Sequence, residues 1–222
     1  MDQNWDAIFG SLEAWQLEQK GEPSVTEIAG DYKQDPWAVL VSTILSLRTK
    51  DEVTAGASRR LLEKAPTPAA LLKLPLEEIA RLAYPAGFYR TKAASLRKIA
   101  AILMEQYGGA VPPEQEALLA LPGVGLKTAN LVLGEAFGRD AICVDIHVHR
   151  ICNRAGWLGA KPSTTPDKTE AALREKLPRK YWRRINALLV RYGQELCRPQ
   201  SPWCSRCVIS GYCERRGLDR SR

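Results

Sequence analysis

Four cysteines near the C-terminus form the clearest candidate site for metal chemistry in this sequence. They follow the spacing C-x6-C-x2-C-x5-C and are Cys197, Cys204, Cys207 and Cys213. Four thiolates this close together bind a metal or pair as disulfides. Structural zinc usually takes two close C-x2-C pairs, whereas this motif has only one. A [4Fe–4S] cluster takes one cysteine at each iron and accepts unequal spacing better. The pattern therefore favours iron–sulfur over zinc, with disulfides third.

A glycine-rich turn followed by a lysine is the second candidate. Segment 114–137 is predicted to form two helices joined by a Pro-Gly-Val-Gly turn at 122–125, with Lys127 in the first turn of the second helix. Exposed N–H groups of such a turn, together with a helix N-terminus, form an anion site that suits a DNA phosphate. The helix dipole there favours a neutral amine, which is a nucleophile for a carbon such as a sugar C1′. A phosphate-binding or solvated lysine is the alternative.

A carboxylate in an apolar stretch is the third candidate. Asp145 follows Ala141–Val144 and precedes a helix predicted to begin near Ile146. A buried carboxylate needs a compensating role, which here is a helix N-cap, catalysis or both. His147 and His149 are the only histidines, and at this spacing they do not share a helix face, which argues against a histidine metal site.

Helices are predicted to position all these residues. Three helix starts combine an N-cap residue with a proline at the first helical position, namely Asp35-Pro36, Thr67-Pro68 and Thr165-Pro166. Ser24 with Glu27 fits a capping box. Between Lys92 and Tyr107 the apolar residues follow helical spacing. No alternating strand pattern or hairpin signal is found, so the predicted fold class is all-α.

Composition and charge narrow the function. Of 222 residues, 45% are hydrophobic and 26% are charged, which is typical of a globular protein. No apolar run is long enough for a membrane span, and the acidic N-terminus does not resemble a signal peptide, so we expect a cytoplasmic protein. Cys143 and Cys152 lie among apolar residues and are expected to be buried structural thiols.

The positive charge is concentrated near the C-terminus. Residues 179–222 contain 11 Lys and Arg but only 3 Asp and Glu, a net charge of +8, while residues 1–178 carry −1. A basic region beside a neutral body suggests a polyanionic partner such as nucleic acid. A solvated basic tail would have the same composition.

Taken together, these motifs resemble the endonuclease III family of DNA glycosylases in the helix-hairpin-helix superfamily. The matching segments are LPGVGLKTAN at 121–130, VDIHVHR at 144–150, the cysteine motif, ILSLRTKD at 44–51 and AGFYRTKA at 86–93. The resemblance covers about residues 25–213. It implies a two-lobed, all-α fold. Residues 29–138 would form a six-helix lobe with the helix-hairpin-helix at about 114–134. Residues 1–28 and 139–222 would form a second lobe carrying a [4Fe–4S] cluster.

The resemblance also implies the activity and its residues. The enzyme would be a monomer in the cytoplasm, at the nucleoid, acting on double-stranded DNA that contains a damaged base or an abasic site. It would flip an oxidised pyrimidine out of the duplex, attack C1′ with Lys127 and cleave the strand by β-elimination through a Schiff base, with Asp145 supporting the developing charge. The implied DNA-binding residues are Arg48, Phe88, Gly123, Val124, Gly125, His147, Arg150 and Arg198.

Two of these positions depart from the family pattern. Arg48 stands where many relatives have Gln, and it could read the orphaned base or contact a phosphate. Phe88 stands where relatives often have an intercalating Leu. Three other functions remain open on this evidence: an adenine-mismatch glycosylase of the same superfamily, a non-catalytic damage-binding protein, and an electron-transfer protein that uses the cluster.

Overall fold

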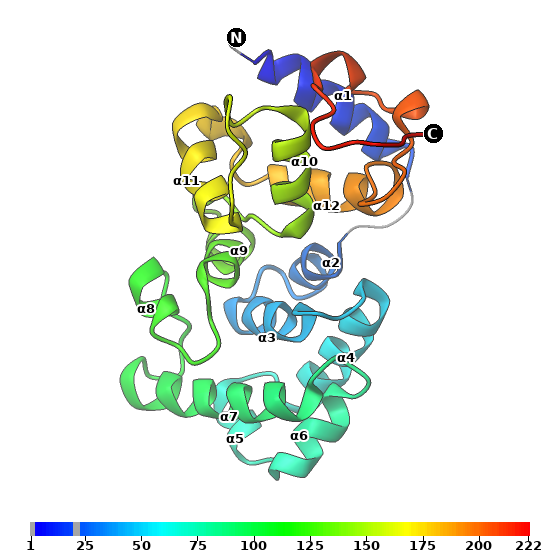
Figure 1. The fold of residues 1–222 in the computed structure, drawn as a ribbon. Coiled ribbons are helices and arrows are strands. Elements are labelled where there is room, and N and C mark those ends of the chain that lie inside the picture. The colour runs from blue at the N-terminus through cyan, green and yellow to red at the C-terminus, as the bar shows by residue number, and fades with distance from the viewer. Residues whose placement is uncertain (1–2, 20–22) are drawn as a thin grey trace. The chain divides into compact units, whose positions relative to one another are not determined.

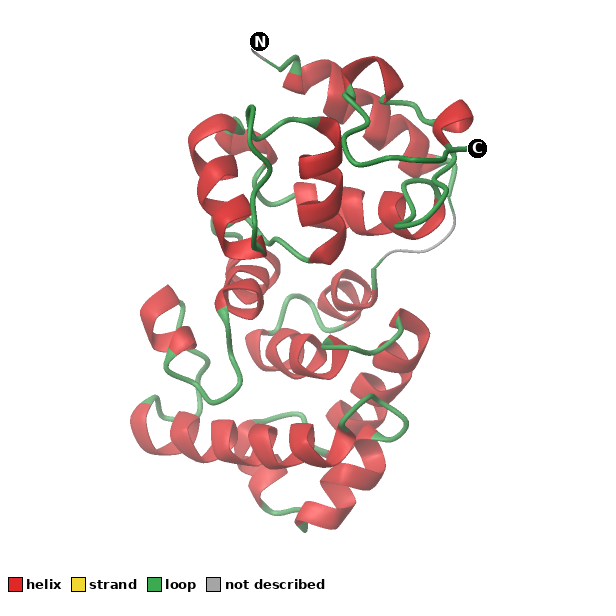
Figure 2. Cartoon of the chain, viewed as in Figure 1, coloured by secondary structure: helices red, strands yellow, loops and turns green. Residues whose placement is uncertain are grey.

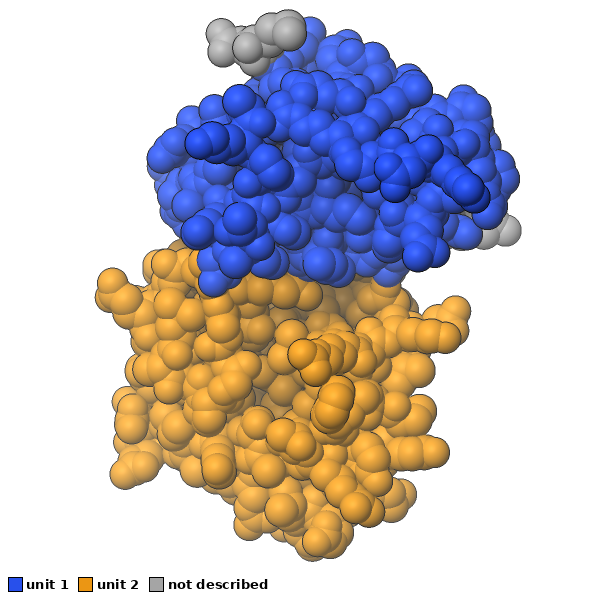
Figure 3. Space-filling view, in the orientation of Figure 1, with its two compact units in different colours: residues 1–22, 140–222 blue, residues 23–139 orange. Residues whose placement is uncertain are grey.

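A computed structural model of the chain describes residues 3–19 and 23–222. Within these ranges every regular element is a helix and none is a strand, which confirms the all-α prediction (Figure 2). The chain forms two compact units (Figure 3). Unit 1 comprises residues 1–22 and 140–222, and unit 2 comprises residues 23–139. Among the described helices, none combines the length and the apolar character that crossing a bilayer requires.

Unit 2, which is described throughout, contains eight α-helices (Figure 1). Six of them have eight or more residues: α2 (Ser24–Asp31), α3 (Pro36–Ser46), α4 (Asp51–Lys64), α6 (Leu76–Ala83), α7 (Tyr89–Gln106) and α9 (Leu126–Phe137). The other two have five residues each and are α5 (Pro68–Leu72) and α8 (Gln115–Leu119). The pair α8 and α9 lies where the helix-hairpin-helix is expected.

Helix α3 forms the core of unit 2. Its residues from Trp37 to Leu45 are all buried, because the helix is apolar around its whole circumference and packs against α2, α4, α7 and α9. The predicted cap is present at its start, where the Asp35 side chain accepts a hydrogen bond from the Ala38 N–H at 2.8 Å. Helix α3 therefore provides a rigid base for the loop that follows it.

The other proline-associated caps are also confirmed, but the capping box is not. Thr67 and Thr165 each accept a hydrogen bond from the N–H three residues downstream. Ser24 is the first residue of α2 rather than its cap, because Pro23 occupies the cap position. Its hydroxyl donates to Oδ1 of Asp51 in α4 at 2.8 Å. A tertiary contact thus replaces the local one that the sequence predicts.

Unit 1 joins the N-terminal helix to the C-terminal part of the chain. Its elements are α1 (Trp5–Leu17), α10 (Ile146–Ala155), α11 (Pro166–Lys176), α12 (Ile185–Glu195) and the short 3-10 helices η1 (Arg179–Tyr181), η2 (Cys204–Arg206) and η3 (Ser210–Tyr212). Aromatic pairs hold α1 in the core. Trp15 packs edge-on against Tyr192 at 4.9 Å between centroids, and Phe9 stacks on Tyr181 at 3.9 Å. The core of unit 1 is therefore built from the two ends of the sequence.

The sequence prediction divides the chain after residues 28 and 138, whereas the two units of the structure meet after residues 22 and 139. The sequence places residues 23–28 in the same lobe as α1, whereas the structure places them in unit 2. The reason is packing, because α2 contacts α3 and α4. Val25 and Ile28 of α2 are buried.

Candidate active site and DNA interface

The predicted turn and its lysine occupy the junction of α8 and α9 in unit 2. The turn is closed by the Val124 N–H, which donates to the Leu121 carbonyl at 3.1 Å. Gly125 is the N-cap of α9, and no side chain caps this helix end. A helix start without a side-chain cap presents N–H groups and the positive end of the dipole to an anion. Lys127 is the second residue of α9, which is in the first turn as predicted. The residue is partly buried.

Gly123 and Gly125 serve the turn differently, which allows a test of DNA contact. Gly123 has a φ of +81°, whereas Gly125 is extended and a Cβ there would meet no described atom within 4 Å beyond its neighbours. We expect Gly123→Ala to destabilise the fold by about 1–2 kcal/mol. We expect Gly125→Ala to change stability by less than about 0.5 kcal/mol yet to weaken duplex binding, because its methyl group would occupy the space of a phosphate. Urea unfolding and fluorescence anisotropy measure the two effects, and unchanged DNA affinity in Gly125→Ala would contradict the contact.

Asp145 caps α10 in unit 1, as predicted. Its Oδ1 accepts hydrogen bonds from the His147 N–H at 2.8 Å and from the Val148 N–H at 2.9 Å. The residue is partly buried and follows the buried segment Ala141–Val144. Because both bonds end on Oδ1, the carboxylate is fixed in orientation while Oδ2 is not used by the cap. Asp145 lies in unit 1 and Lys127 in unit 2, so the two predicted catalytic side chains belong to different units.

Arg48 and Phe88 are brought together in unit 2. The Arg48 Cζ lies 5.7 Å from the centroid of the Phe88 ring, within the range of a cation–π interaction. Both backbones are left-handed, with φ of +53° and +57°, a conformation that is strained for residues other than glycine. Both side chains are exposed, and Phe88 keeps 64% of its surface accessible. An exposed ring beside a guanidinium suits stacking and hydrogen bonding with bases.

Sequence reasoning missed Lys92 of α7, which lies beneath this pair of residues. Lys92 is only 6% exposed, and its Nζ donates to the carbonyls of Leu45 at 2.7 Å and Leu47 at 2.6 Å and to Oγ1 of Thr49 at 2.8 Å. Burial lowers the pKa of this lysine to about 8. The available signal was its position on the apolar stripe of the helix, four residues before Leu96.

His147 and Arg198 lie on one shallow groove in unit 1. Its lining residues are His147, Gly193, Gln194, Arg198, Pro199 and Gln200. Arg150 donates to His147 Nδ1 at 3.1 Å and to the carbonyls of Gly193 at 3.0 Å and Cys197 at 2.9 Å. Because arginine has only donors, Nδ1 of His147 is the acceptor in this contact. Arg150 therefore orients His147, while its own DNA contact stays a prediction.

Three of the four C-terminal cysteines, Cys197, Cys207 and Cys213, pack against the core of unit 1. Cys143 and Cys152 are buried, as predicted. Burial raises the pKa of the Cys197 and Cys213 thiols. Metal binding deprotonates such thiols and compensates for the burial of the charge. Among the described residues, no three His, Cys, Asp or Glu side chains are grouped as ligands of a single metal ion.

Hydrogen-bond donors contact three of the four sulfur atoms of this cysteine motif. The contacts are Arg154 Nη1 to Cys197 Sγ at 3.1 Å, Tyr192 Oη to Cys207 Sγ at 3.1 Å, and the Arg215 N–H to Cys213 Sγ at 3.4 Å. Arg154 is buried in α10 and also donates to the carbonyls of Arg198 and Pro199. Burial raises the pKa of Tyr192, which keeps its hydroxyl protonated as a donor. Donors to thiolate sulfur are what the ligands of an iron–sulfur cluster require, so these residues fit such a cluster.

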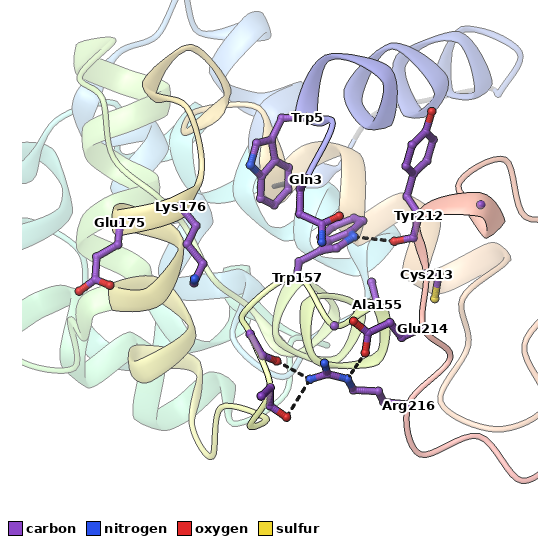
Figure 4. A pocket seen from close by; sticks show the side chains of 14 residues that line it. Gln3, Trp5, Ala155, Trp157, Glu175, Lys176, Tyr212, Cys213, Glu214 and Arg216 are labelled. Carbon is purple, nitrogen blue, oxygen red and sulfur yellow. Dashed lines mark hydrogen bonds and ion pairs between the residues drawn. The ribbon is translucent and has the colours of Figure 1, made fainter. Parts of the chain in front are cut away.

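A pocket beside Cys213 shows how the last cysteine is anchored (Figure 4). The Trp157 Nε1–H donates to the Tyr212 carbonyl at 2.9 Å. Arg216 pairs with Glu214 at 2.5 Å and donates to the Gly159 carbonyl. These contacts tie the segment around Cys213 to the residues after α10. The sequence singles out none of the pocket residues except Cys213.

Comparison with known proteins identifies the family. Residues 41–179 match the profile of the HhH-GPD superfamily of base excision DNA repair proteins. Endonuclease III of Thermotoga maritima is 44% identical over 210 residues, which cover 93% of this chain and 97% of that protein.

Two solved structures show the same fold. Endonuclease III trapped as a covalent intermediate with DNA, in an estranged-adenine complex, has a TM-score of 0.76 and 34% identity, and the match covers 82% of this chain and 84% of that one. A thermostable thymine-DNA glycosylase has a TM-score of 0.79 and 28% identity, with 93% of each chain covered. The fold and enzyme class that the motifs predict are thus confirmed: the chain belongs to the endonuclease III family of base-excision repair proteins and is a DNA glycosylase and AP lyase.

Proposed function

We propose that this enzyme excises oxidised pyrimidines and cleaves DNA at the resulting abasic site, with Lys127 as nucleophile and Asp145 as its charged partner. The position of Lys127 carries the assignment. It is the second residue of α9, directly after a turn without a side-chain cap. Support comes from the related endonuclease III that was trapped covalently on DNA, because a covalent intermediate requires a nucleophilic side chain.

Lysine suits this chemistry because an amine can form an iminium. The damaged nucleotide leaves the base stack, and the neutral Lys127 amine attacks C1′. The C1′–N bond breaks and the base leaves after taking up a proton. The new C–N linkage loses a proton, and the sugar ring opens as its oxygen is protonated, which produces the iminium. Loss of the acidified C2′ proton then breaks the C3′–O bond, with the 3′ phosphate as leaving group. Water hydrolyses the iminium and regenerates the lysine.

Asp145 has two roles in this proposal. As the N-cap it organises the start of α10 through the His147 and Val148 N–H groups. As a carboxylate it stabilises the positive charge that develops at the sugar and assists proton transfer.

Two substitutions separate these roles of Asp145. Asparagine is as good a cap as aspartate, so we expect Asp145→Asn to keep the thermal stability of the wild type, whereas Asp145→Ala loses about 1 kcal/mol. Both variants lose the charge, and we expect both to excise bases about 10²–10⁴-fold more slowly. Thermal unfolding and single-turnover base release measure the two effects. Full excision activity in Asp145→Asn would show that the residue is only a cap.

The DNA contacts are assigned as follows. The N–H groups of the turn at Gly123, Val124 and Gly125 bind a phosphate at the start of α9. Arg48 and Phe88 fill the space that the flipped nucleotide leaves. In unit 1, His147, Arg150 and Arg198 contact the DNA backbone, with Arg150 also orienting His147. The substrate is chromosomal DNA, so we place the enzyme at the nucleoid in the cytoplasm, acting as a monomer.

We assign the four C-terminal cysteines as ligands of a [4Fe–4S] cluster. Cys197, Cys204, Cys207 and Cys213 supply one thiolate to each iron. When bound, the cluster supplies structural cross-linking of the C-terminal segment rather than hydrolytic chemistry. Arg154, Tyr192 and the Arg215 N–H stabilise the thiolates through the contacts to sulfur described above.

Borohydride trapping tests the proposed function directly. The purified enzyme is incubated with a duplex that carries one abasic site, reduced with borohydride and digested for peptide mapping. We expect a covalent adduct on Lys127. An adduct on another residue would reassign the nucleophile. Tight binding of lesion-containing DNA with no adduct, by protein that holds its iron, would contradict the lyase mechanism and indicate a damage-binding protein.

A further inference from the structure

We infer that Lys92 is a positioning residue that ties the Arg48 loop to the Phe88 loop, so that their two exposed side chains meet DNA as one unit. The Arg48 loop is residues 47–50, between α3 and α4, and the Phe88 loop is residues 84–88, between α6 and α7. The inference deepens the proposed function and rests on the roles it gives to Arg48 and Phe88.

Lys92 is attached to the two loops by different parts of the residue. Its main-chain N–H donates to the Phe88 carbonyl at 3.0 Å, within the first turn of α7. Its side chain crosses to the end of α3 and the Arg48 loop, where Nζ donates to the carbonyls of Leu45 in α3 and Leu47 in the loop and to Thr49 Oγ1. An ammonium group has three N–H donors, and these three oxygens match them.

Thr49 completes the connection between the loops. Its Oγ1, which lies 2.8 Å from Lys92 Nζ, also accepts a hydrogen bond from the Gly87 N–H at 3.0 Å. The backbones touch at the same place, because a Cβ on Gly87 would lie 2.6 Å from the Arg48 carbonyl oxygen. The loops can approach this closely only because residue 87 is glycine.

The strained backbones at the loop tips need such support. Arg48 and Phe88 both have left-handed φ values, which persist in a protein only where surrounding contacts hold them. The network around Lys92 lies directly beside both residues. It therefore accounts for how two residues with strained backbones keep the Arg48 Cζ 5.7 Å from the centroid of the Phe88 ring.

The presence of a charged ammonium group at position 92, on a buried stripe, also indicates a specific role. The helix stripe that Lys92 shares with Leu96, Ile99 and Leu103 is otherwise apolar and buried. Neutral oxygens are the partners of its ammonium in the part of the chain described here, and burial lowers its pKa. An apolar residue would pack on this stripe without that desolvation cost, so the hydrogen bonds to the Arg48 loop are what the lysine adds.

Hydrogen–deuterium exchange of the free protein tests the link between the loops. The variants are Lys92→Met, which keeps the length of the side chain but removes the donors, and Lys92→Arg, which keeps donors. Lys98→Met is the control, because Lys98 is an exposed lysine on the same helix. We expect faster exchange in both loops of Lys92→Met, partial rescue in Lys92→Arg and no change in Lys98→Met. Unchanged exchange of residues 84–89 in Lys92→Met would overturn the proposal.

A double-mutant cycle tests the consequence for DNA. The measured quantity is the preference for a duplex with one tetrahydrofuran abasic analogue over an intact duplex. We expect Lys92→Met to lower this preference about tenfold in the wild type but by less than about twofold when Arg48→Ala and Phe88→Ala are already present. An equal loss in both backgrounds would show that Lys92 acts elsewhere, and would overturn the proposal.

Two further experiments cover a folding failure of Lys92→Met and separate this inference from the proposed lyase mechanism. If Lys92→Met fails to fold, Gly87→Ala and Thr49→Val disturb the same junction with Lys92 intact, and each should lower the preference in the same way. No loss in either variant would contradict the inference. Borohydride trapping by the wild type is measured in parallel. Its failure would refute the lyase mechanism, whereas binding to the tetrahydrofuran duplex needs no nucleophile and reports on Lys92 alone.

Discussion

Replacement of Lys127 by glutamine is expected to slow strand cleavage at an abasic site by roughly 10³-fold or more and to abolish the borohydride adduct. Glutamine has nearly the same length and can still donate a hydrogen bond, but its amide nitrogen is not a nucleophile and cannot form an iminium. The second position of α9 tolerates glutamine, so the fold should be retained. Cleavage of an end-labelled duplex under single-turnover conditions measures the effect.

The DNA affinity of the Lys127→Gln variant distinguishes two roles of Lys127, as a nucleophile or as a phosphate ligand. If Lys127 is the nucleophile, Lys127→Gln should bind the tetrahydrofuran duplex with an affinity close to that of the wild type. Lys64→Gln, at an exposed lysine in the last turn of α4, is the matched control and should cleave at the normal rate. Loss of binding that accounts for the whole loss of cleavage would assign Lys127 to phosphate binding instead.

Replacement of Cys207 by serine is expected to release iron, remove the visible absorbance of the cluster and lower the melting temperature by about 10 °C or more. The segment from Cys197 to Cys213 has only short 3-10 helices, and it contributes Ile209 to the hydrophobic core of unit 1. With so little core of its own, the segment is expected to depend on the cross-link that the proposed cluster would provide through four thiolates. Iron analysis, absorbance and thermal unfolding measure the effect.

A buried cysteine outside the motif provides the control for this prediction. Cys152 is fully buried, and burial raises the pKa of its thiol, so it is an inert structural residue. Cys152→Ala should keep its iron and its visible absorbance. Wild-type protein that contains zinc instead of iron would contradict the assigned cluster, as would full iron content in Cys207→Ser.

The sequence determines those features that arise within a few residues along the chain. The Asp35, Thr67 and Thr165 caps each bond to an N–H three residues away, and Asp145 bonds to N–H groups two and three residues away. Helix spacing and the order of the motifs were sufficient for the all-α fold and the enzyme class. Such features are predictable because the interacting groups are held close by the covalent chain.

The tertiary structure alone decides the contacts between residues that are distant in the sequence. The Ser24 hydroxyl donates to Asp51 of α4 instead of capping its own helix, and Arg48 meets Phe88 across forty residues. Lys92 lies on the apolar stripe of its helix in the sequence, but only the packing of α7 on α3 shows which carbonyls its ammonium group contacts. The burial of a side chain and left-handed backbone strain depend on how the helices pack. The spacing of apolar residues along a helix does not determine which loops will contact each other. The contacts that hold Arg48 and Phe88 next to each other are therefore decided only when the helices pack together.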